Sequence, residues 1–340
     1  MVKLPRKQWS MMDKAMAASY FFIHMLCILA PFHFNWSAFR VAFILYIITG
    51  LFGITISYHR NLSHKSFKLP KWLEYLFAYC GVHTLQGDPI SWVSTHRYHH
   101  QYVDTKKDPH SPIHGFLFSH ITWIFDSYSY TKKVCSELVC DSHEEEISVR
   151  KEEKWTNVGD LKKQIFYRFI HKTYLLHPIA LAILLYAIGG IPYIIWGMCV
   201  RTVMLFHVTF MVNSIGHIWG KQPWKNGDLS RNNWWLSLLL FGEGWHNNHH
   251  AFEYSAKFGI DWWQIDFGWY VIIFLKAIGL ANHVKVPSET TTSGDQSSPN
   301  FRLQSLATAT DQLLTATFGN HHSQPSTATF NDCRQQIPLY

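Results

Sequence analysis

The stretch Gly242–Phe252 reads GEGWHNNHHAF and places His246, His249 and His250 within five residues, beside one glutamate and two asparagines. A lone histidine on an apolar face is normally a hydrogen-bonded core residue. Neutral imidazole, however, is also the commonest side-chain metal ligand, and packing alone does not explain three imidazoles so close together. The stretch therefore predicts a metal site, and the remainder of the chain is expected to complete it.

Two more histidine clusters and one polar pair lie upstream. HRNLSH spans residues 59–64, HRYHH spans 96–100, and Asn213 stands one helical turn before His217. Residues three and four apart share a face of a helix, so the histidines within each cluster can point to one place. The candidate metal ligands are nine histidines: His59, His64, His96, His99, His100, His217, His246, His249 and His250.

Nine nitrogen ligands exceed the roughly four to six that one transition-metal ion takes. The sequence therefore predicts two ions, with Asn213 able to supply an oxygen directly or through a water molecule. One ion surrounded by several outer histidines is the simpler alternative. Structural zinc sites favour cysteine, and none of the clusters contains one. Two redox-active irons fit the imidazole ligands, whereas a di-zinc site would have to be hydrolytic.

Composition points to a membrane protein. Of 340 residues 48% are hydrophobic, and the chain carries 24 Phe, 16 Tyr and 15 Trp. The net charge of +7 comes without a basic stripe or a nucleic-acid-binding motif, so we expect no nucleic-acid partner and assign the charge to loops flanking the membrane. The six cysteines show no disulfide spacing, which fits working parts that face a reducing cytosol.

Four apolar runs approach the roughly 20 residues that a membrane-crossing helix needs. They cover about residues 15–36, 38–57, 174–196 and 197–219. The short connections predict two hairpins, and neither connection contains Lys or Arg, whereas the flanking segments are basic. By the positive-inside tendency, the histidine clusters lie on the cytosolic side.

Two further apolar blocks, 72–90 and 262–280, contain carboxylates, so we expect interfacial or buried helices there and not membrane spans. We predict one membrane domain over residues 1–286 and a disordered tail over 287–340, which is rich in Ser, Thr, Gln and Asn. The N-terminal residues show no signal-peptide or transit-peptide pattern, which favours the endoplasmic reticulum membrane over the plastid.

The clusters HRNLSH, HRYHH and GEGWHNNHH, with NSIGH before the last, resemble those of the membrane fatty-acyl desaturases. The resembling branch contains the animal stearoyl-CoA desaturases and the plant and cyanobacterial delta-9-type acyl-lipid desaturases. DPHSP at 108–112 and HIWGKQPW at 217–224 also resemble that branch. The resemblance runs from about residue 9 to 286. It excludes part of a charged segment, 134–154, which is longer than usual for the family, and the tail has no family counterpart.

The resemblance implies an all-α integral membrane protein with two transmembrane hairpins under a cytosolic helical cap. It implies that the nine histidines, with Asn213 through water, hold two Fe²⁺ ions. The implied reaction uses O₂ and two electrons to introduce a cis double bond, at a delta-9-type or related position, into a long-chain acyl-CoA or acyl-lipid. Electrons are expected from cytochrome b5 and its NADH-dependent reductase, or from ferredoxin in a plastid. This donor is a separate protein, because the chain contains no His-Pro-Gly-Gly haem motif.

Other residues near the clusters have candidate roles. Trp92, Trp245 and Trp262 are expected to line the acyl tunnel, with core packing as the alternative, and Arg97 is expected to meet a phosphate-bearing headgroup or the acidic face of cytochrome b5. Glu243 either orients a ligand histidine or caps a helix. Competing functions are a hydroxylase on the same scaffold, a di-zinc lipid hydrolase, and a catalytically silent lipid-binding membrane protein.

Overall fold

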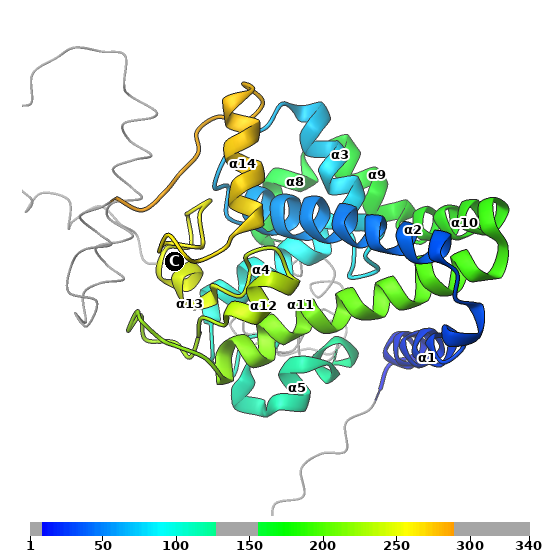
Figure 1. Ribbon diagram of the computed structural model, residues 1–340. Helices are drawn as coiled ribbons and strands as arrows, with labels where there is room; N and C mark the ends of the chain where they lie inside the picture. The colour runs from blue at the N-terminus through cyan, green and yellow to red at the C-terminus, as the bar shows by residue number, and fades with distance from the viewer. Residues whose placement is uncertain (1–8, 127–155, 289–340) are drawn as a thin grey trace, which may run out of the picture.

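The computed structural model describes residues 9–126 and 156–288, and every regular element in these residues is a helix (Figure 1). The segment 134–154 and, apart from its first two residues, the tail 287–340 lie outside the described residues. The first described part contains α1 (Met11–Cys27), η1 (Pro31–His33), α2 (Trp36–Ile47), η2 (Ile48–Ser63), α3 (Lys71–Val82), α4 (Pro89–Tyr102), η3 (Pro112–His114), α5 (Phe116–His120) and η4 (Thr122–Phe125). The second contains η5 (Thr156–Val158), α8 (Gly159–Lys162), α9 (Ile165–Thr173), α10 (Leu176–Ile194), η6 (Ile195–Val200), α11 (Arg201–Ile218), α12 (Trp234–Leu239), α13 (His246–Ala251) and α14 (Phe267–Ala277).

The first long helix joins α2 to the π-helical segment η2 and runs over Trp36–Ser63. Its start is fixed by Asn35, whose side chain accepts a hydrogen bond from the Ala38 amide at 2.7 Å. The helix continues past the predicted span 38–57, because no proline interrupts it and the Ser63 hydroxyl donates to the Tyr58 carbonyl at 2.7 Å. His59 is therefore held on the same continuous helix that enters the apolar region.

The second long segment runs over Leu176–Ile218 and turns back on itself (Figure 1). The turn is at Gly190, whose φ of 64° and ψ of −151° are readily accessible only to glycine. Pro192 follows and lacks the amide that would continue the hydrogen-bond ladder. The turn falls in the sequence Gly189-Gly190-Ile191-Pro192. The predicted boundary between spans at residues 196 and 197 was wrong, because that position lies inside a helix.

Helix α1 is shorter than the predicted span 15–36. It covers the 17 residues Met11–Cys27 and ends before Pro31, which starts a separate short turn. Its Tyr20 ring stacks on Phe206 of α11 with ring centroids 4.5 Å apart. In the part of the chain that the structure describes, two helical segments, 28 and 43 residues long, meet the length and hydropathy expected of a membrane span. These candidate spans are consistent with a membrane protein.

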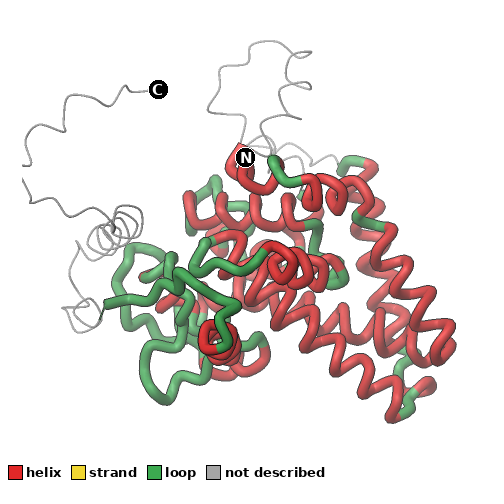
Figure 2. The backbone as a smooth tube through the Cα atoms, turned by 90° about the horizontal axis from the view of Figure 1, so that it is seen from above, coloured by secondary structure: helices red, strands yellow, loops and turns green. Residues whose placement is uncertain are grey.

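Shorter helices, among them α4 and α13, which carry histidines, gather at one end of the long helices, the polar end. Figure 1 shows α4, α12 and α13 near the end of α11, away from the turn between α10 and α11, and Figure 2 shows most loops on one side of the molecule. A buried apolar cluster that includes Tyr58, Val93 and Tyr167 packs η2 against α4 and α9. This packing fixes the histidine-bearing ends of η2 and α4 relative to each other.

Candidate metal centre

The nine predicted histidines come from four helical segments that meet at this polar end. His59 lies in η2 and His64 follows its last residue, while His217 lies at the end of α11. Helix α4 supplies three histidines and α13 supplies the last three. All nine are buried or partly buried.

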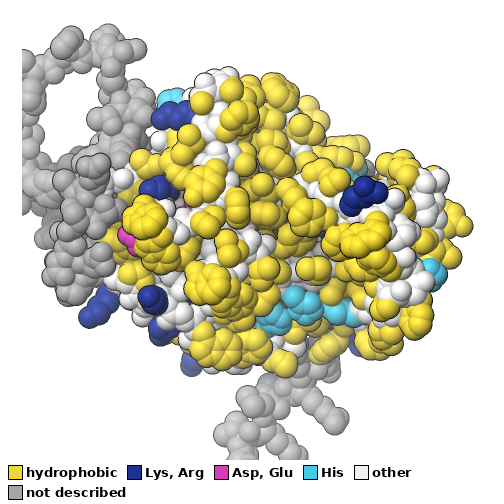
Figure 3. Space-filling model, in the orientation of Figure 1, with side chains coloured by type: hydrophobic (Ala, Val, Ile, Leu, Met, Phe, Trp, Pro, Cys, Tyr) yellow, Lys and Arg dark blue, Asp and Glu magenta, His cyan; other side chains and the backbone are white. Residues whose placement is uncertain are grey.

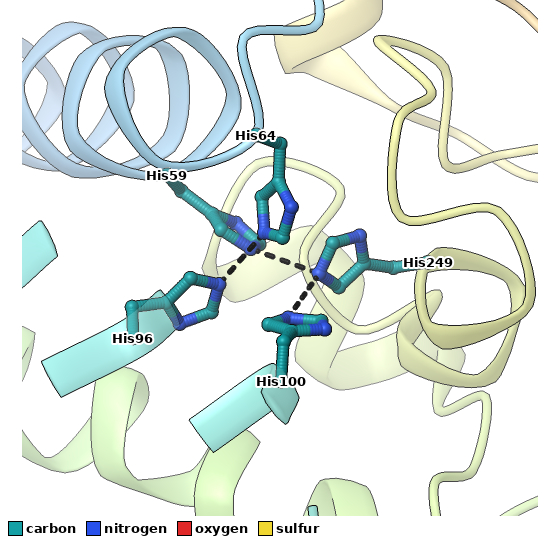
Figure 4. A group of neighbouring side chains, drawn as sticks. All are labelled: His59, His64, His96, His100 and His249. Atoms are coloured by element: carbon teal, nitrogen blue, oxygen red, sulfur yellow. Dashed lines mark hydrogen bonds between the residues drawn. The ribbon is translucent and has the colours of Figure 1, made fainter. Parts of the chain in front are cut away.

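Five of the histidines form one group, shown in Figure 4 with their rings pointing toward one another. One ring nitrogen from each lies within 4.8 Å of the others, and the group is His59, His64, His96, His100 and His249. The Nε2 atoms of His64 and His96 are 2.8 Å apart. The Nε2 atom of His249 lies 3.1 Å from that of His59 and 3.0 Å from that of His100.

The other four histidines form a second group, His99, His217, His246 and His250, again with one ligand atom each within 4.8 Å. The Nε2 atoms of His217 and His246 are 2.9 Å apart. His99 and His100 are neighbours in sequence but belong to different groups, and so are His249 and His250. Successive residues of a helix point about 100° apart, so one helix can supply both groups.

Carboxylates hold the outer nitrogen of several rings. The Nδ1 atom of His99 is 3.0 Å from Asp108, that of His217 is 3.2 Å from Asp104, and that of His250 is 3.1 Å from Asp228. The Nδ1 atom of His59 contacts Glu243, and Glu253 lies 3.5 Å from Nδ1 of His100. A carboxylate only accepts, so the four hydrogen-bonded rings donate from Nδ1 and present the lone pair of Nε2 to the interior.

The inward-facing nitrogens fit a metal ion. One proton on Nε2 of His249 cannot satisfy both His59 and His100, and among the described residues the buried Nε2 atoms of His99 and His250 have no hydrogen-bond partner. Buried polar atoms are normally satisfied, and a cation would satisfy all of these lone pairs together. For metal–nitrogen bonds of about 2.1 Å, neighbouring ligands lie roughly 3.0–3.4 Å apart, which is close to the observed separations.

Several of these rings are neutral at neutral pH, which is the form that binds metal. Burial is the main cause that lowers their pKa well below the usual value of 6.5, and neighbouring histidines lower it further. The five histidines with this large shift are His64, His96, His246, His249 and His250. Acid should therefore compete poorly with metal at these rings until well below neutral pH.

A fully buried ion-pair network supports the first group. Arg60 is inaccessible to solvent and contacts Glu243 at 3.1 Å and Asp266 at 2.9 Å. It also donates to the carbonyl of Ala256 at 2.9 Å and lies over the ring of Phe258. Glu243 therefore links the Arg60 cation to the His59 ring.

A family model described as fatty acid desaturase matches residues 34–273, which contain all nine histidines. The chain belongs to the fatty acid desaturase family. Its relatives are named as desaturases, so the predicted activity and enzyme class, an oxidoreductase, are confirmed.

Three relatives illustrate the similarity of this desaturase. It is 59% identical over 283 residues to the chloroplastic palmitoyl-monogalactosyldiacylglycerol delta-7 desaturase of Arabidopsis thaliana, covering 83% of this chain and 71% of the relative. It is 55% identical over 267 residues to the acyl-CoA C20 Delta5-desaturase of Anemone leveillei, covering 78% and 80%. It is 52% identical over 283 residues to delta-9 acyl-lipid desaturase 1 of Arabidopsis thaliana, covering 83% and 87%.

The glycines and asparagines of GEGWHNNHH shape the desaturase's last cluster. A side chain on Gly244 would come within 2.2 Å of the Ser237 amide, so only glycine fits there. Asn247 accepts from the Trp224 amide at 2.8 Å, and Asn248 donates to the Phe258 carbonyl at 2.8 Å. These bonds fix the start of the short helix α13 and thereby aim its three histidines.

The contacts of Glu243 and Arg97 show what each does in the structure. Glu243 holds the ring of His59 and does not cap α13, whose first turn has no side-chain cap. Contact of Arg97 with a headgroup or cytochrome b5 stays a prediction, and the structure shows its contacts within the chain. All five of its N–H groups are engaged, with both oxygens of Asp160 at 2.9 Å and with backbone carbonyls, so it joins α4 to η2 and α8.

The three tryptophans differ in position. Trp92 stacks on the His96 ring with centroids 5.1 Å apart and therefore borders the first group. Trp245 is 3% exposed and donates to the Ile265 carbonyl at 2.8 Å. Trp262 is 94% exposed, so its predicted place in the wall of an enclosed tunnel was wrong. Asn213 is half-buried on α11, one turn before His217.

Three carboxylates that lie beside the Nδ1 atoms of the histidines were not predicted from the sequence. Asp104, Asp228 and Glu253 lie in or next to loops whose path depends on the whole fold. Asp108 had a signal, because it begins the quoted DPHSP stretch. Arg60 had one too, as the second residue of HRNLSH.

Replacing Glu243 with glutamine should weaken metal binding by about 10–100-fold, which is typical when a partner of a ligand histidine is lost. Glutamine keeps the volume but removes the negative charge that fixes His59 and balances Arg60. The measurement is metal content after dialysis against graded chelator. Glu74→Gln is the control, because Glu74 is a buried carboxylate that contacts Lys71 and Tyr167 away from both groups. Equal metal retention in Glu243→Gln and wild type would contradict the assignment.

Proposed function

We propose that this desaturase introduces a cis double bond, at a delta-9-type or related position, into a long-chain acyl-CoA or acyl-lipid, with two Fe²⁺ ions bound by the nine histidines. The observation that carries the proposal is the division of these histidines into groups of five and four, with inward-facing Nε2 atoms. A single ion takes roughly four to six ligands, so two groups suit two ions.

In this proposal the five-histidine group holds one ion, and the four-histidine group holds the other with Asn213 through water. When bound, the irons supply the redox chemistry with O₂ that removal of hydrogen from an unactivated methylene requires, which no side-chain acid or base supplies. Zinc has no redox chemistry and would not serve.

The chain's own residues position and protect the site. Asp108, Asp104 and Asp228 fix the tautomer and orientation of their partner rings, and their negative charge offsets the charge of bound cations. Burial of the histidines excludes water, which keeps the reacting region dry. Trp92 stands against His96, and we propose that it borders the acyl chain and helps to set which carbons reach the site.

The membrane arrangement in this proposal is two hairpins that enter from the cytosolic side. Helices α10 and α11 support one hairpin, because little of their apolar surface is buried by the rest of the described protein. Helix α1 with α2 and η2 forms the other, although α1 alone is short for a full crossing. The membrane is that of the endoplasmic reticulum. A separate donor supplies electrons, either cytochrome b5 with its NADH-dependent reductase or, in a plastid, ferredoxin.

The acyl carrier is either coenzyme A or a glycerolipid. Relatives named for an acyl-CoA, for an acyl-lipid and for a monogalactosyldiacylglycerol resemble this chain at 52–59% identity. Their names also give three different positions, so similarity alone does not select the carbon that is attacked.

The test is expression in yeast that lacks its own delta-9 desaturase, followed by fatty-acid analysis by gas chromatography and mass spectrometry. We expect a new monounsaturated fatty acid, whose fragmentation gives the double-bond position. If the main product is a hydroxylated fatty acid, the proposed function changes from desaturase to hydroxylase. If neither product forms, co-expression of a plant cytochrome b5 or ferredoxin with its reductase tests the donor, and continued absence in metal-loaded protein would contradict the proposal.

A further inference from the structure

A basic cleft of about 570 Å³ lies between the loop after η2, the start of α3 and the segment after α14. Four lysines, Lys65, Lys68, Lys71 and Lys285, line it together with two carboxylates, Glu74 and Asp160. It is outside both histidine groups, and the reaction proposed above does not use it.

The carboxylates do not neutralise this cleft. Glu74 is 2.8 Å from Lys71, and Asp160 is shared between Lys65 at 3.0 Å and Arg97. Within the described residues, Lys68 and Lys285 contact no carboxylate. Lys285 lines the cleft together with Lys65 and Lys68, and burial and the positive charges of these two lysines lower its pKa.

The backbone fixes the two unpaired lysines in place. Lys68 and Asn282 exchange two backbone hydrogen bonds, at 2.8 and 3.0 Å, and the amide of Lys285 donates to the Ser66 carbonyl at 2.9 Å. The loop after η2 is thus paired with the segment after α14. A site held in this way loses little conformational entropy when it binds an anion.

Exposed apolar side chains flank the cleft. Trp72 and Leu76 lie one turn apart on α3, and Phe274 on α14 lies one turn before Ile278, which follows the last residue of that helix; all four are at least half exposed. Figure 3 shows basic side chains beside the hydrophobic surface over α14. Binding of a soluble phosphate would require only the cations and not the apolar surface beside them. Cations bordered by apolar surface and a tryptophan are typical of a membrane interface, where basic pockets bind lipid headgroups.

We propose that this cleft binds the phosphate of an anionic phospholipid, whose acyl chains lie along the exposed faces of α3 and α14. The lipid is a bound component of the surrounding membrane and not the substrate. It ties the loop after the histidine motif HRNLSH to the membrane surface.

The test uses the full-length, metal-loaded protein in nanodiscs that mix phosphatidylglycerol with phosphatidylcholine, with native mass spectrometry of the retained lipid. In Lys68→Gln/Lys285→Gln, the affinity for phosphatidylglycerol should fall about 30-fold, at about 1 kcal/mol per lysine, with phosphatidylcholine unchanged. Lys106→Gln/Lys172→Gln removes the same charge from exposed positions outside the cleft and outside α3 and α14, and should keep wild-type retention.

A charge-preserving variant, Lys68→Arg/Lys285→Arg, should retain the lipid and shows whether substitution itself disturbs the fold. If the cleft and control variants lose equal affinity for phosphatidylglycerol, the binding comes from general attraction between a basic protein and an anionic membrane surface. Displacement of phosphatidylglycerol by coenzyme A at equal concentration would assign the cleft to a soluble phosphate-bearing carrier. Either result would overturn the proposal without bearing on desaturation, which this measurement does not require.

Discussion

Replacing His249 with alanine is expected to lower desaturase activity by more than about 100-fold and to remove metal from the five-histidine group. The Nε2 atom of His249 lies about equally far from those of His59 and His100, so it stands between two other ligands. Loss of a mere partner of a ligand already costs about 10–100-fold, and loss of a ligand should cost more. The measurements are metal content by mass spectrometry and double-bond formation in the yeast assay.

His177→Ala is the matched control for this substitution. His177 is also hydrogen-bonded on a helix, to Thr173 at 2.9 Å and Tyr79 at 3.3 Å, but it belongs to neither group. We expect its metal content and product yield to stay near those of the wild type. Full metal occupancy and normal product in His249→Ala would remove His249 from the proposed ligand set.

Replacing Arg60 with methionine is expected to destabilise the protein by about 3–5 kcal/mol, the usual cost of leaving a buried ion pair without one partner. Methionine fills part of the space but leaves Glu243 and Asp266 as buried carboxylates without their cation. Glu243 would then hold His59 less firmly, so metal affinity should fall as well. A fluorescence-detected melting curve in detergent measures the first effect, and metal content measures the second.

The double variant Arg60→Met/Asp266→Asn separates charge from packing. Removing one of the two stranded carboxylates should recover part of the lost melting temperature. If the double variant melts even lower than Arg60→Met, Asp266 stabilises the protein mainly by accepting from the amides of Phe258, Gly259 and Trp269, and its stranded charge is not the main cost of Arg60→Met.

Short spacings in the sequence were enough to predict which histidines come together. HRYHH and WHNNHH each place their rings within one or two helical turns, so local geometry already brings them close. Their division into five and four could not be predicted, because it depends on how α4, α13 and α11 are oriented across distances set by the whole fold. For the same reason the contacts of Asp104 with His217 and of Asp228 with His250 could not be predicted, because both carboxylates come from separate loops.

Hydropathy predicted the membrane segments better than it predicted their ends. The observed helix continues beyond the predicted run 38–57 to Ser63. Its hydrogen bonding continues into polar residues, which hydropathy does not detect. The run 15–36 was apolar throughout, yet α1 stops at Cys27. The sequence also does not show that backbone carbonyls and Asp160 occupy all of the donors of Arg97.

Neighbouring histidines serve different groups on two separate helices, through His99 and His100 on α4 and through His249 and His250 on α13. The distance between the two groups is therefore fixed by the backbone geometry of these helices and not by flexible side chains. One inserted or deleted residue would turn the following part of either helix by about 100° and misdirect both groups at once. The relative placement of the two groups is consequently set by the same two helices. An insertion or deletion in either helix therefore cannot alter one group and leave the other intact.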